Sequence, residues 1–329
     1  MNALASSLQT YFTTFAHAQR DLSVNTIASY RDTWRLFLKY LAATLGAPAD
    51  AIDFDVLTAA NVTGFLDNLE RDRGNCARTR NARLTAIRAV LVRALPDHPE
   101  HGATITQVLA IPPKRTVRKV IAFLTASEVD ALLAAPDRTT WTGRRDHALL
   151  ALTVQTGLRV SEICALTRDD IHLGTGPHVA CTGKGRRQRI TPLTRATVGT
   201  MKAYLAERVT QPGTALFSGP QGRPLSRDAL EHRLAKHLAT ATATCPSLTA
   251  KQISMHALRH TAAMNLLAVG VDISVIALWL GHADTHSTDA YLHANMAIKQ
   301  AAIDRTRPPG VKPGTYKPTP DILAWLSAL

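Results

Sequence analysis

Four short segments in the second half of the chain hold the residue types needed to cleave a phosphodiester bond without a metal ion. Such cleavage requires a nucleophile, cationic donors for the non-bridging oxygens and an acid for the leaving oxygen. Tyrosine, arginine, lysine and histidine can supply these functions, and all four occur in the segments. The segments are TGLRVSEICAL at 156–166, GKGRRQRITPL at 183–193, HALRHTAA at 256–263 and LGHADTHSTDAYLH at 280–293.

Each motif taken alone has an ordinary structural explanation. Arg159 and Glu162 have the spacing of an ion pair within a helix. His256 could cap a helix, and Tyr291 could be a half-buried packing residue. His256 and His260 have the i, i+4 spacing of a zinc pair, but the residues between them include an arginine and no glutamate. We therefore expect no metal site, and the alternative of a zinc-dependent hydrolase predicts tight, stoichiometric metal in the purified protein.

The order of the four motifs resembles the catalytic domain of the tyrosine recombinases, also called the phage integrase family. The resemblance extends over residues 122–303, and the helical part before it is similar in layout to the family's core-site DNA-binding domain. It implies a Xer-like, two-domain site-specific recombinase or integrase acting on double-stranded DNA recombination sites. The implied reaction is transesterification through a covalent 3′-phosphotyrosine, which conserves the energy of the broken bond and needs no cofactor or metal.

The resemblance also implies roles for individual residues. Tyr291 matches the nucleophile, Arg159 and Arg259 the phosphate-holding arginines, Lys184 the acid for the leaving 5′-hydroxyl, His256 the general acid/base, and His282 the position that supports the phosphate or the tyrosine. Glu162 matches a supporting carboxylate, and His260 matches a second histidine with a structural role. Cations around a phosphate would lower the cost of deprotonating a tyrosine, whose pKa is ordinarily about 10.

The charge of the chain indicates a polyanionic partner. Lysine and arginine number 38 against 25 acidic residues, a formal net charge of +13. Up to Pro113 the count is 11 basic against 10 acidic residues, and from Lys114 onward it is 27 against 15, so the second part carries the excess. The candidate DNA-contacting residues are Arg78, Arg80, Arg83, Arg88, Lys114, Arg115, Arg118, Lys119, Arg186 and Arg187. For the arginines at 78–88, a solvated helix face is an equal alternative.

Apolar periodicity predicts helices at 18–45, 58–69 and 76–95, a capped helix at 125–133, a longer helix ending at Gly157, and helices at 195–207, 226–240, 255–269 and 272–280. Two β-inclined runs within 179–193 predict a hairpin with a cationic tip. We expect a mainly α fold: a helical, SAM-like core-binding domain at 1–110, a basic linker at 111–121, and a mostly helical α/β catalytic domain with a small antiparallel sheet at 122–305.

The tail at 306–329 contains five prolines and then an apolar stripe formed by Ile322, Leu326 and Leu329. This stripe is too short to form a stable helix alone, so it is expected to dock. The resemblance implies exchange with a neighbouring protomer in a tetramer on DNA, and docking on the same catalytic domain is equally open.

Several biological roles fit these features. A mobile-element integrase or transposase-type recombinase is favoured slightly by the tail, and a Xer-like chromosome dimer resolution enzyme is the alternative. A catalytically silent DNA-binding accessory protein and a type IB topoisomerase are further rivals. No apolar run approaches the length of a membrane span, and the N-terminus lacks the features of a secretory signal, so a cytoplasmic location is expected.

Overall fold

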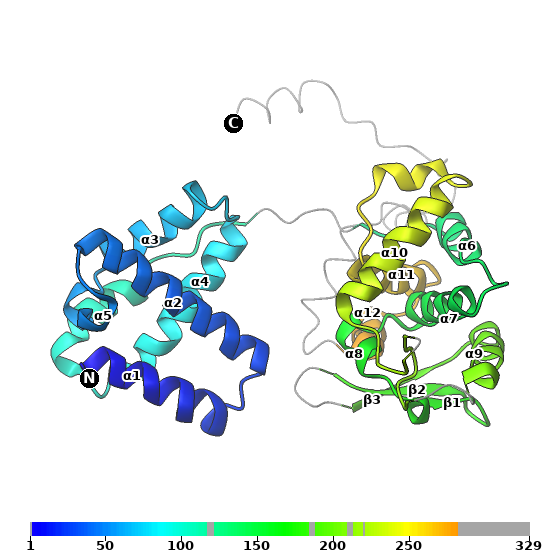
Figure 1. Ribbon diagram of the computed structural model, residues 1–329, viewed down its shortest axis with the longest axis horizontal. Helices are drawn as coiled ribbons and strands as arrows, with labels where there is room; N and C mark the ends of the chain where they lie inside the picture. Colours follow the sequence, from blue (N-terminus) through cyan, green and yellow to red (C-terminus); the bar gives the residue numbers. More distant parts are fainter. Residues whose placement is uncertain (1, 117–121, 184–187, 209–212, 220, 282–329) are drawn as a thin grey trace, which may run out of the picture. The chain divides into compact units, whose positions relative to one another are not determined.

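The computed structural model describes residues 2–116, 122–183, 188–208, 213–219 and 221–281. The chain divides into two compact units, Met1–Arg118 and Lys119–Leu329 (Figure 1). The described part is mostly helical with one small antiparallel sheet, which confirms the predicted fold class. None of the helices in these ranges is both long and apolar enough to cross a membrane.

Helices are the only regular secondary structure among the described residues of the first unit. Its core contains Trp34, Phe37 and Phe65, which are almost completely buried. The predicted helix at 18–45 begins later than expected, because Ser23 caps its start and Asp21 adopts a positive φ of 44°. The elements are α1 (Ala3–Thr10), the π-helix η1 (Tyr11–Gln19), α2 (Val24–Leu45), η2 (Ala49–Ala51), η3 (Phe54–Val56), α3 (Ala59–Arg71), α4 (Ala77–Ala94), η4 (Pro99–His101) and α5 (Gly102–Leu109).

The second unit places helices around a core, with the sheet at the end opposite α6 (Figure 1). Its helices are α6 (Ala126–Ala134), α7 (Trp141–Thr156), α8 (Val160–Ala165), η5 (Arg168–Asp170), α9 (Arg195–Arg208), α10 (Arg227–Thr242), η7 (Pro246–Ala250), α11 (Met255–Ala268) and α12 (Ile273–Leu280). Its strands are β1 (Ile171–His172), β2 (His178–Thr182) and β3 (Gln188–Pro192). The strands are ordered β1-β2-β3 and are antiparallel, so the predicted hairpin is confirmed and β1 is an unpredicted addition.

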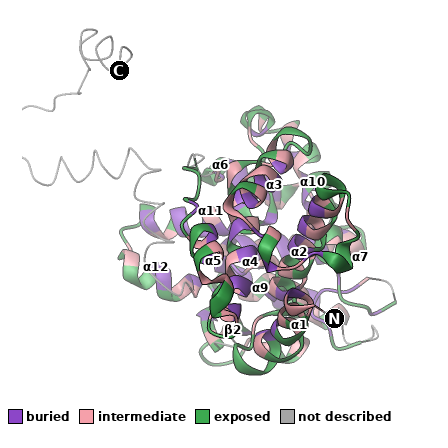
Figure 2. Ribbon diagram, turned by 90° about the vertical axis from the view of Figure 1, so that its left-hand side faces the viewer, coloured by how far each residue is buried: buried purple, intermediate pink, exposed green. Residues whose placement is uncertain are grey.

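Local sequence explains where the key elements of this unit begin and end. Thr125 and Glu128 form the predicted capping box at the start of α6. Gly157 ends α7 and Gly281 ends α12, and both have a left-handed φ of 64° that favours glycine. Helix α11 is buried over most of its length, as Figure 2 shows by colour. The two glycine turns and α11 together position the site described next.

Candidate active site

Two arginines converge on the pair of glycine turns that end α7 and α12. Arg159 is the N-cap residue of α8, and its Nη2 donates to the Gly281 carbonyl at 2.8 Å. Arg259, on α11, donates from Nη1 to the Gly157 carbonyl at 2.7 Å and from Nη2 to the Leu280 carbonyl at 2.6 Å. The structure therefore brings together two positions that are 100 residues apart in the sequence.

The two guanidinium groups differ in their access to solvent. Arg259 is 2% exposed, whereas the Arg159 side chain is 28% exposed. Gly157 allows this close packing, because a Cβ there would lie 2.7 Å from Leu280 Cδ2 and 3.0 Å from the Ala262 Cβ. Arg159 is therefore the arginine that can reach an external phosphate most directly, while Arg259 also holds the backbone of both turns.

Glu162 is a buried carboxylate shared between two arginines. It accepts from the Arg159 amide at 2.7 Å and from Arg159 Nη1 at 2.8 Å. It also accepts from Arg189 Nη1 at 3.0 Å and from Arg189 Nη2 at 2.7 Å. Burial would raise the pKa of Glu162, but the Arg159 amide and the charge of Arg189 outweigh it and lower that pKa below its ordinary value. Glu162 is thus an anion that fixes both side chains.

Arg189 is a member of this cluster that the motif spacing did not reveal. It lies on β3 opposite Cys181, 27 residues from its carboxylate partner, so no helical spacing rule relates the two. The available indication was its place in a strand, where alternation puts it on the same face as Thr191. Thr191 is buried, which agrees with that face being the inner one.

The two histidines of the third motif lie side by side on α11. The rings of His256 and His260 meet edge to face with their centroids 4.3 Å apart. His256 precedes Arg259 by one helical turn, as expected. Partial desolvation, followed by the positive charges of Arg259 and Arg159, lowers the pKa of His256 below its ordinary value. Within the described residues, no group of three or more potential ligands is placed to hold a metal ion.

The arginines of α4 separate into two kinds. Arg80 is 4% exposed and its Nε lies 3.6 Å from Glu70, so this side chain is enclosed by the protein. Arg83 donates to Thr33 Oγ1 at 2.8 Å, and Arg88 donates to the Ile111 carbonyl, so both brace the unit internally. Arg78 is exposed.

The described part of the basic segment at the end of the first unit is exposed. Lys114 and Arg115 are exposed, and the Lys114 ammonium pairs with Glu70. The remaining sequence candidates, namely Arg118, Lys119, Lys184, Arg186, Arg187, His282, Tyr291 and the tail at 306–329, lie outside the described residues.

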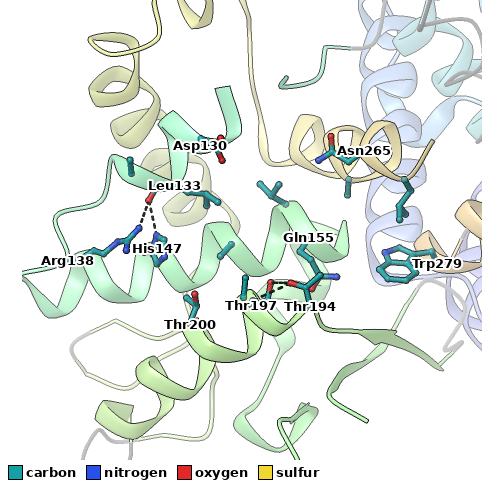
Figure 3. A pocket seen from close by; sticks show the side chains of 16 residues that line it. Asp130, Leu133, Arg138, His147, Gln155, Thr194, Thr197, Thr200, Asn265 and Trp279 are labelled. Carbon is teal, nitrogen blue, oxygen red and sulfur yellow. Dashed lines mark hydrogen bonds between the residues drawn. The ribbon is translucent and has the colours of Figure 1, made fainter. Parts of the chain in front are cut away.

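A hollow of about 640 Å³ lies in the second unit between α6, α7, α9, α11 and α12 (Figure 3). Val154 and Leu266 give it apolar walls, and Asn265 and Gln155 contribute polar groups. Trp279 lines the same hollow and donates from Nε1 to the Thr156 carbonyl at 3.2 Å. Through this bond the hollow adjoins the turn that holds Arg259.

Comparisons with known proteins show which family the chain is similar to. The model of the phage integrase family matches residues 122–297. A Sinorhizobium fredii protein named as an integrase/recombinase, y4rC, is 46% identical over 327 residues, which cover 99% of this chain and 98% of that protein. The tyrosine recombinase XerD of Halalkalibacterium halodurans is 32% identical over 303 residues, which cover 89% of this chain and 94% of that protein.

A solved structure shows the same fold. The structure of the Tn1549 transposon integrase in complex with transposon right end DNA matches with a TM-score of 0.69 at 15% sequence identity, covering 93% of this chain and 99% of that chain. The family match and the relatives, taken with the paired arginines at the glycine turns, lead to one identification. The chain belongs to the phage integrase family and is a tyrosine site-specific recombinase.

Proposed function

We propose that this recombinase cuts and rejoins DNA strands by transesterification, with Tyr291 as the nucleophile and a 3′-phosphotyrosine as the intermediate. The observation that carries the proposal is the convergence of Arg159 and Arg259 on the Gly281 turn. His282 follows this turn directly in the sequence and Tyr291 follows within ten residues, so the motif with the nucleophile starts at the arginine site.

The cationic cluster performs the electrostatic part of the reaction. Arg159 and Arg259 neutralise the charge that builds on the non-bridging oxygens and stabilise the transition state more than the ground state. The lowered pKa of His256 favours its neutral ring, which can accept the proton of the tyrosine hydroxyl. Lys184 protonates the leaving 5′-oxygen, and His282 supports the phosphate or the tyrosine. Attack by a second 5′-hydroxyl on the phosphotyrosine then rejoins the strands.

DNA contacts come from the exposed basic residues rather than from every arginine of α4. Arg78, Lys114 and Arg115 are exposed in the first unit. With Arg118, Lys119, Arg186 and Arg187 they form the phosphate-contacting set, in keeping with the net charge of +13. Arg80, Arg83 and Arg88 are left out because, unlike the exposed Lys114, they are buried or partly buried and are held by internal contacts.

The biological role that we favour is a mobile-element integrase or transposase-type recombinase. The 46% identity to y4rC, a protein named as an integrase/recombinase, supports the integrase part of this role. The resemblance to XerD keeps chromosome dimer resolution as the alternative. Mapping cleavage positions on DNA that flanks the encoding gene separates the two, because an element integrase cuts at the ends of its element and a resolution enzyme cuts at a single chromosomal site.

The tail provides the contact between protomers in the recombining complex. Its apolar stripe of Ile322, Leu326 and Leu329 requires an apolar surface, and the hollow lined by Val154, Leu266 and Trp279 offers one (Figure 3). The tail of one copy docks in the hollow of the next copy. Assembly is thereby linked, through Trp279, to the Gly157 turn that Arg259 binds. Docking within one copy is the competing outcome of the truncation experiment described below.

A nicked suicide substrate tests the catalytic proposal. The wild-type protein should form a denaturant-resistant adduct with DNA, and Tyr291→Phe should bind DNA normally but form none, because only the hydroxyl is lost. An adduct with the phenylalanine variant would assign the nucleophile elsewhere. Absence of any adduct with the wild-type protein on flanking DNA, with binding retained, would favour a catalytically silent accessory protein.

A further inference from the structure

Arg189 occupies a central place in the cluster that the proposed mechanism does not use. We propose that Arg189 is a positioning residue for strand cleavage. It balances the negative charge of Glu162, so that the positive charge of Arg159 remains available to the scissile phosphate. This inference rests on the proposed function. It is carried by the bidentate contact between Arg189 and Glu162, at 3.0 and 2.7 Å, and by the charge balance of the site.

The charge balance explains why a second cation is needed. Glu162 is 3% exposed, so its negative charge is poorly screened by water. Arg189, at 11% exposed, uses both terminal nitrogens on this carboxylate, whereas Arg159 uses one nitrogen on Glu162 and one on the Gly281 carbonyl. Together with Arg259, the cluster has three guanidinium groups and one carboxylate. Its net charge is therefore +2, and it would fall to +1 without Arg189.

Arg189 also packs directly against the turn that receives the other arginines. A Cβ built on Gly281 would lie 2.5 Å from Arg189 Nη1 and 3.2 Å from its Cδ. The same glycine provides the carbonyl that Arg159 binds at 2.8 Å. One side chain from β3 thus contacts both the carboxylate that orients Arg159 and the turn that leads to His282.

The register of β3 favours this ion pair over apolar burial. Ile190 is 66% exposed, while Arg189 on one side of it and Thr191 on the other face inward. A shift of one residue would bury Ile190 and expose Arg189, since successive side chains alternate between faces. Burying Arg189 leaves the Ile190 side chain in solvent, a cost that an ion pair at the surface would not involve. The inward placement of Arg189 therefore serves the buried cluster.

The test compares four proteins in the suicide-substrate assay: wild type, R189M, E162Q and the double variant E162Q/R189M. Loss of Arg189 leaves Arg159 as the main counter-charge of Glu162, so R189M should bind DNA normally but cleave about 100-fold more slowly, as when one charge-stabilising donor is lost. Removing the carboxylate as well restores the net charge of the cluster to +2. Glutamine can still accept a hydrogen bond from the Arg159 amide, so the start of α8 keeps its cap. The double variant should therefore cleave at least about tenfold faster than R189M.

A neutral methylphosphonate at the scissile position gives a second readout. This linkage carries no charge, so the defect of R189M should shrink on it, whereas a defect caused by misfolding would persist. R195M is the matched control: Arg195 is an exposed arginine at the start of α9, and its loss should leave cleavage unchanged. If R189M folds poorly, R189Q, which can still donate to Glu162, replaces it with the same expectations.

The outcomes separate this inference from the proposed function. Cleavage by R189M at the wild-type rate would overturn the role of Arg189 and leave the tyrosine mechanism unaffected. A double variant no faster than R189M, with an equal defect on the methylphosphonate, would reduce Arg189 to a purely structural residue. A wild-type protein that forms no adduct would instead contradict the proposed function itself.

Discussion

The buried carboxylate of Glu128 allows a quantitative prediction about the stability of the second unit. Glu128 is 1% exposed and accepts from Lys251 Nζ at 2.6 Å, Ser247 Oγ at 2.6 Å and the Thr125 amide at 2.8 Å. Lys251 also donates to the Phe123 carbonyl at 3.0 Å, so the cluster ties the entry of this unit to α6 and η7. Burial alone would raise the pKa of Glu128, but Lys251, Ser247 and the amide lower it from 4.5 to about 2.

The size and the pH dependence of the effect follow from this shift. At about 1.4 kcal/mol per pKa unit, the stabilisation by ionised Glu128 is about 3 kcal/mol near neutral pH. The pKa is lower in the folded state than in the unfolded state, so this stabilisation is fully present above pH 4.5 and is lost as the pH falls toward 2. Glu128→Gln should therefore lower the free energy of unfolding by about 3 kcal/mol at pH 7 and by about half as much at pH 3.

Urea unfolding of the full chain, followed by circular dichroism at pH 7 and pH 3, measures this difference. Glu207→Gln is the matched control, because Glu207 pairs with Arg144 at 2.7 Å but both side chains are about one-third exposed. Its cost should stay below about 1 kcal/mol at either pH. Equal losses for Glu128→Gln at both pH values would refute the reasoning, since they would show that the side chain stabilises the fold by packing rather than by charge.

Three further predictions concern the site. Gly157→Ala should lower the free energy of unfolding by about 2 kcal/mol in urea titrations, because φ is 64° and the new Cβ would meet Leu280 Cδ2 at 2.7 Å; an unchanged midpoint would contradict this. Lys184→Ala should slow cleavage severely on normal DNA but much less on DNA with a 5′-bridging sulfur, which leaves without protonation, and equal impairment would rule out the acid role. Deleting residues 318–329 should preserve single-site binding in mobility-shift assays and weaken two-duplex assembly, whereas full assembly would indicate docking within one copy.

Much of the fold was predictable because local sequence decides it. The capping box of Thr125 and Glu128 and the left-handed glycine at 157 set the boundaries of α6 and α7 where the sequence placed them. The hairpin followed from two β-inclined runs around a basic, glycine-containing turn. The ion pair of Arg159 with Glu162, expected from their spacing, is present at 2.8 Å, although Arg159 caps the helix instead of lying within it.

The remaining features depend on contacts between distant residues. Hydrophobicity alone would place Ile190 toward the core. In the structure Arg189 faces inward to pair with Glu162, and Ile190 on the opposite face of β3 is exposed. The α4 helix has arginines at 78, 80, 83, 88 and 93, and only the packing of α4 against its neighbours shows that Arg80 is enclosed while Arg78 is exposed. The convergence of Arg159 and Arg259 likewise arises from the meeting of two glycine turns, which no local pattern encodes.

Mass spectrometry of the trapped protein–DNA complex tests the central claim most directly. The complex formed on a suicide substrate is digested with protease and nuclease, and the peptide that retains a nucleotide is sequenced by fragmentation. The account predicts a single modified peptide, with the nucleotide joined through its 3′-phosphate to the hydroxyl of Tyr291. Attachment to another residue, or through a 5′-phosphate, would contradict it.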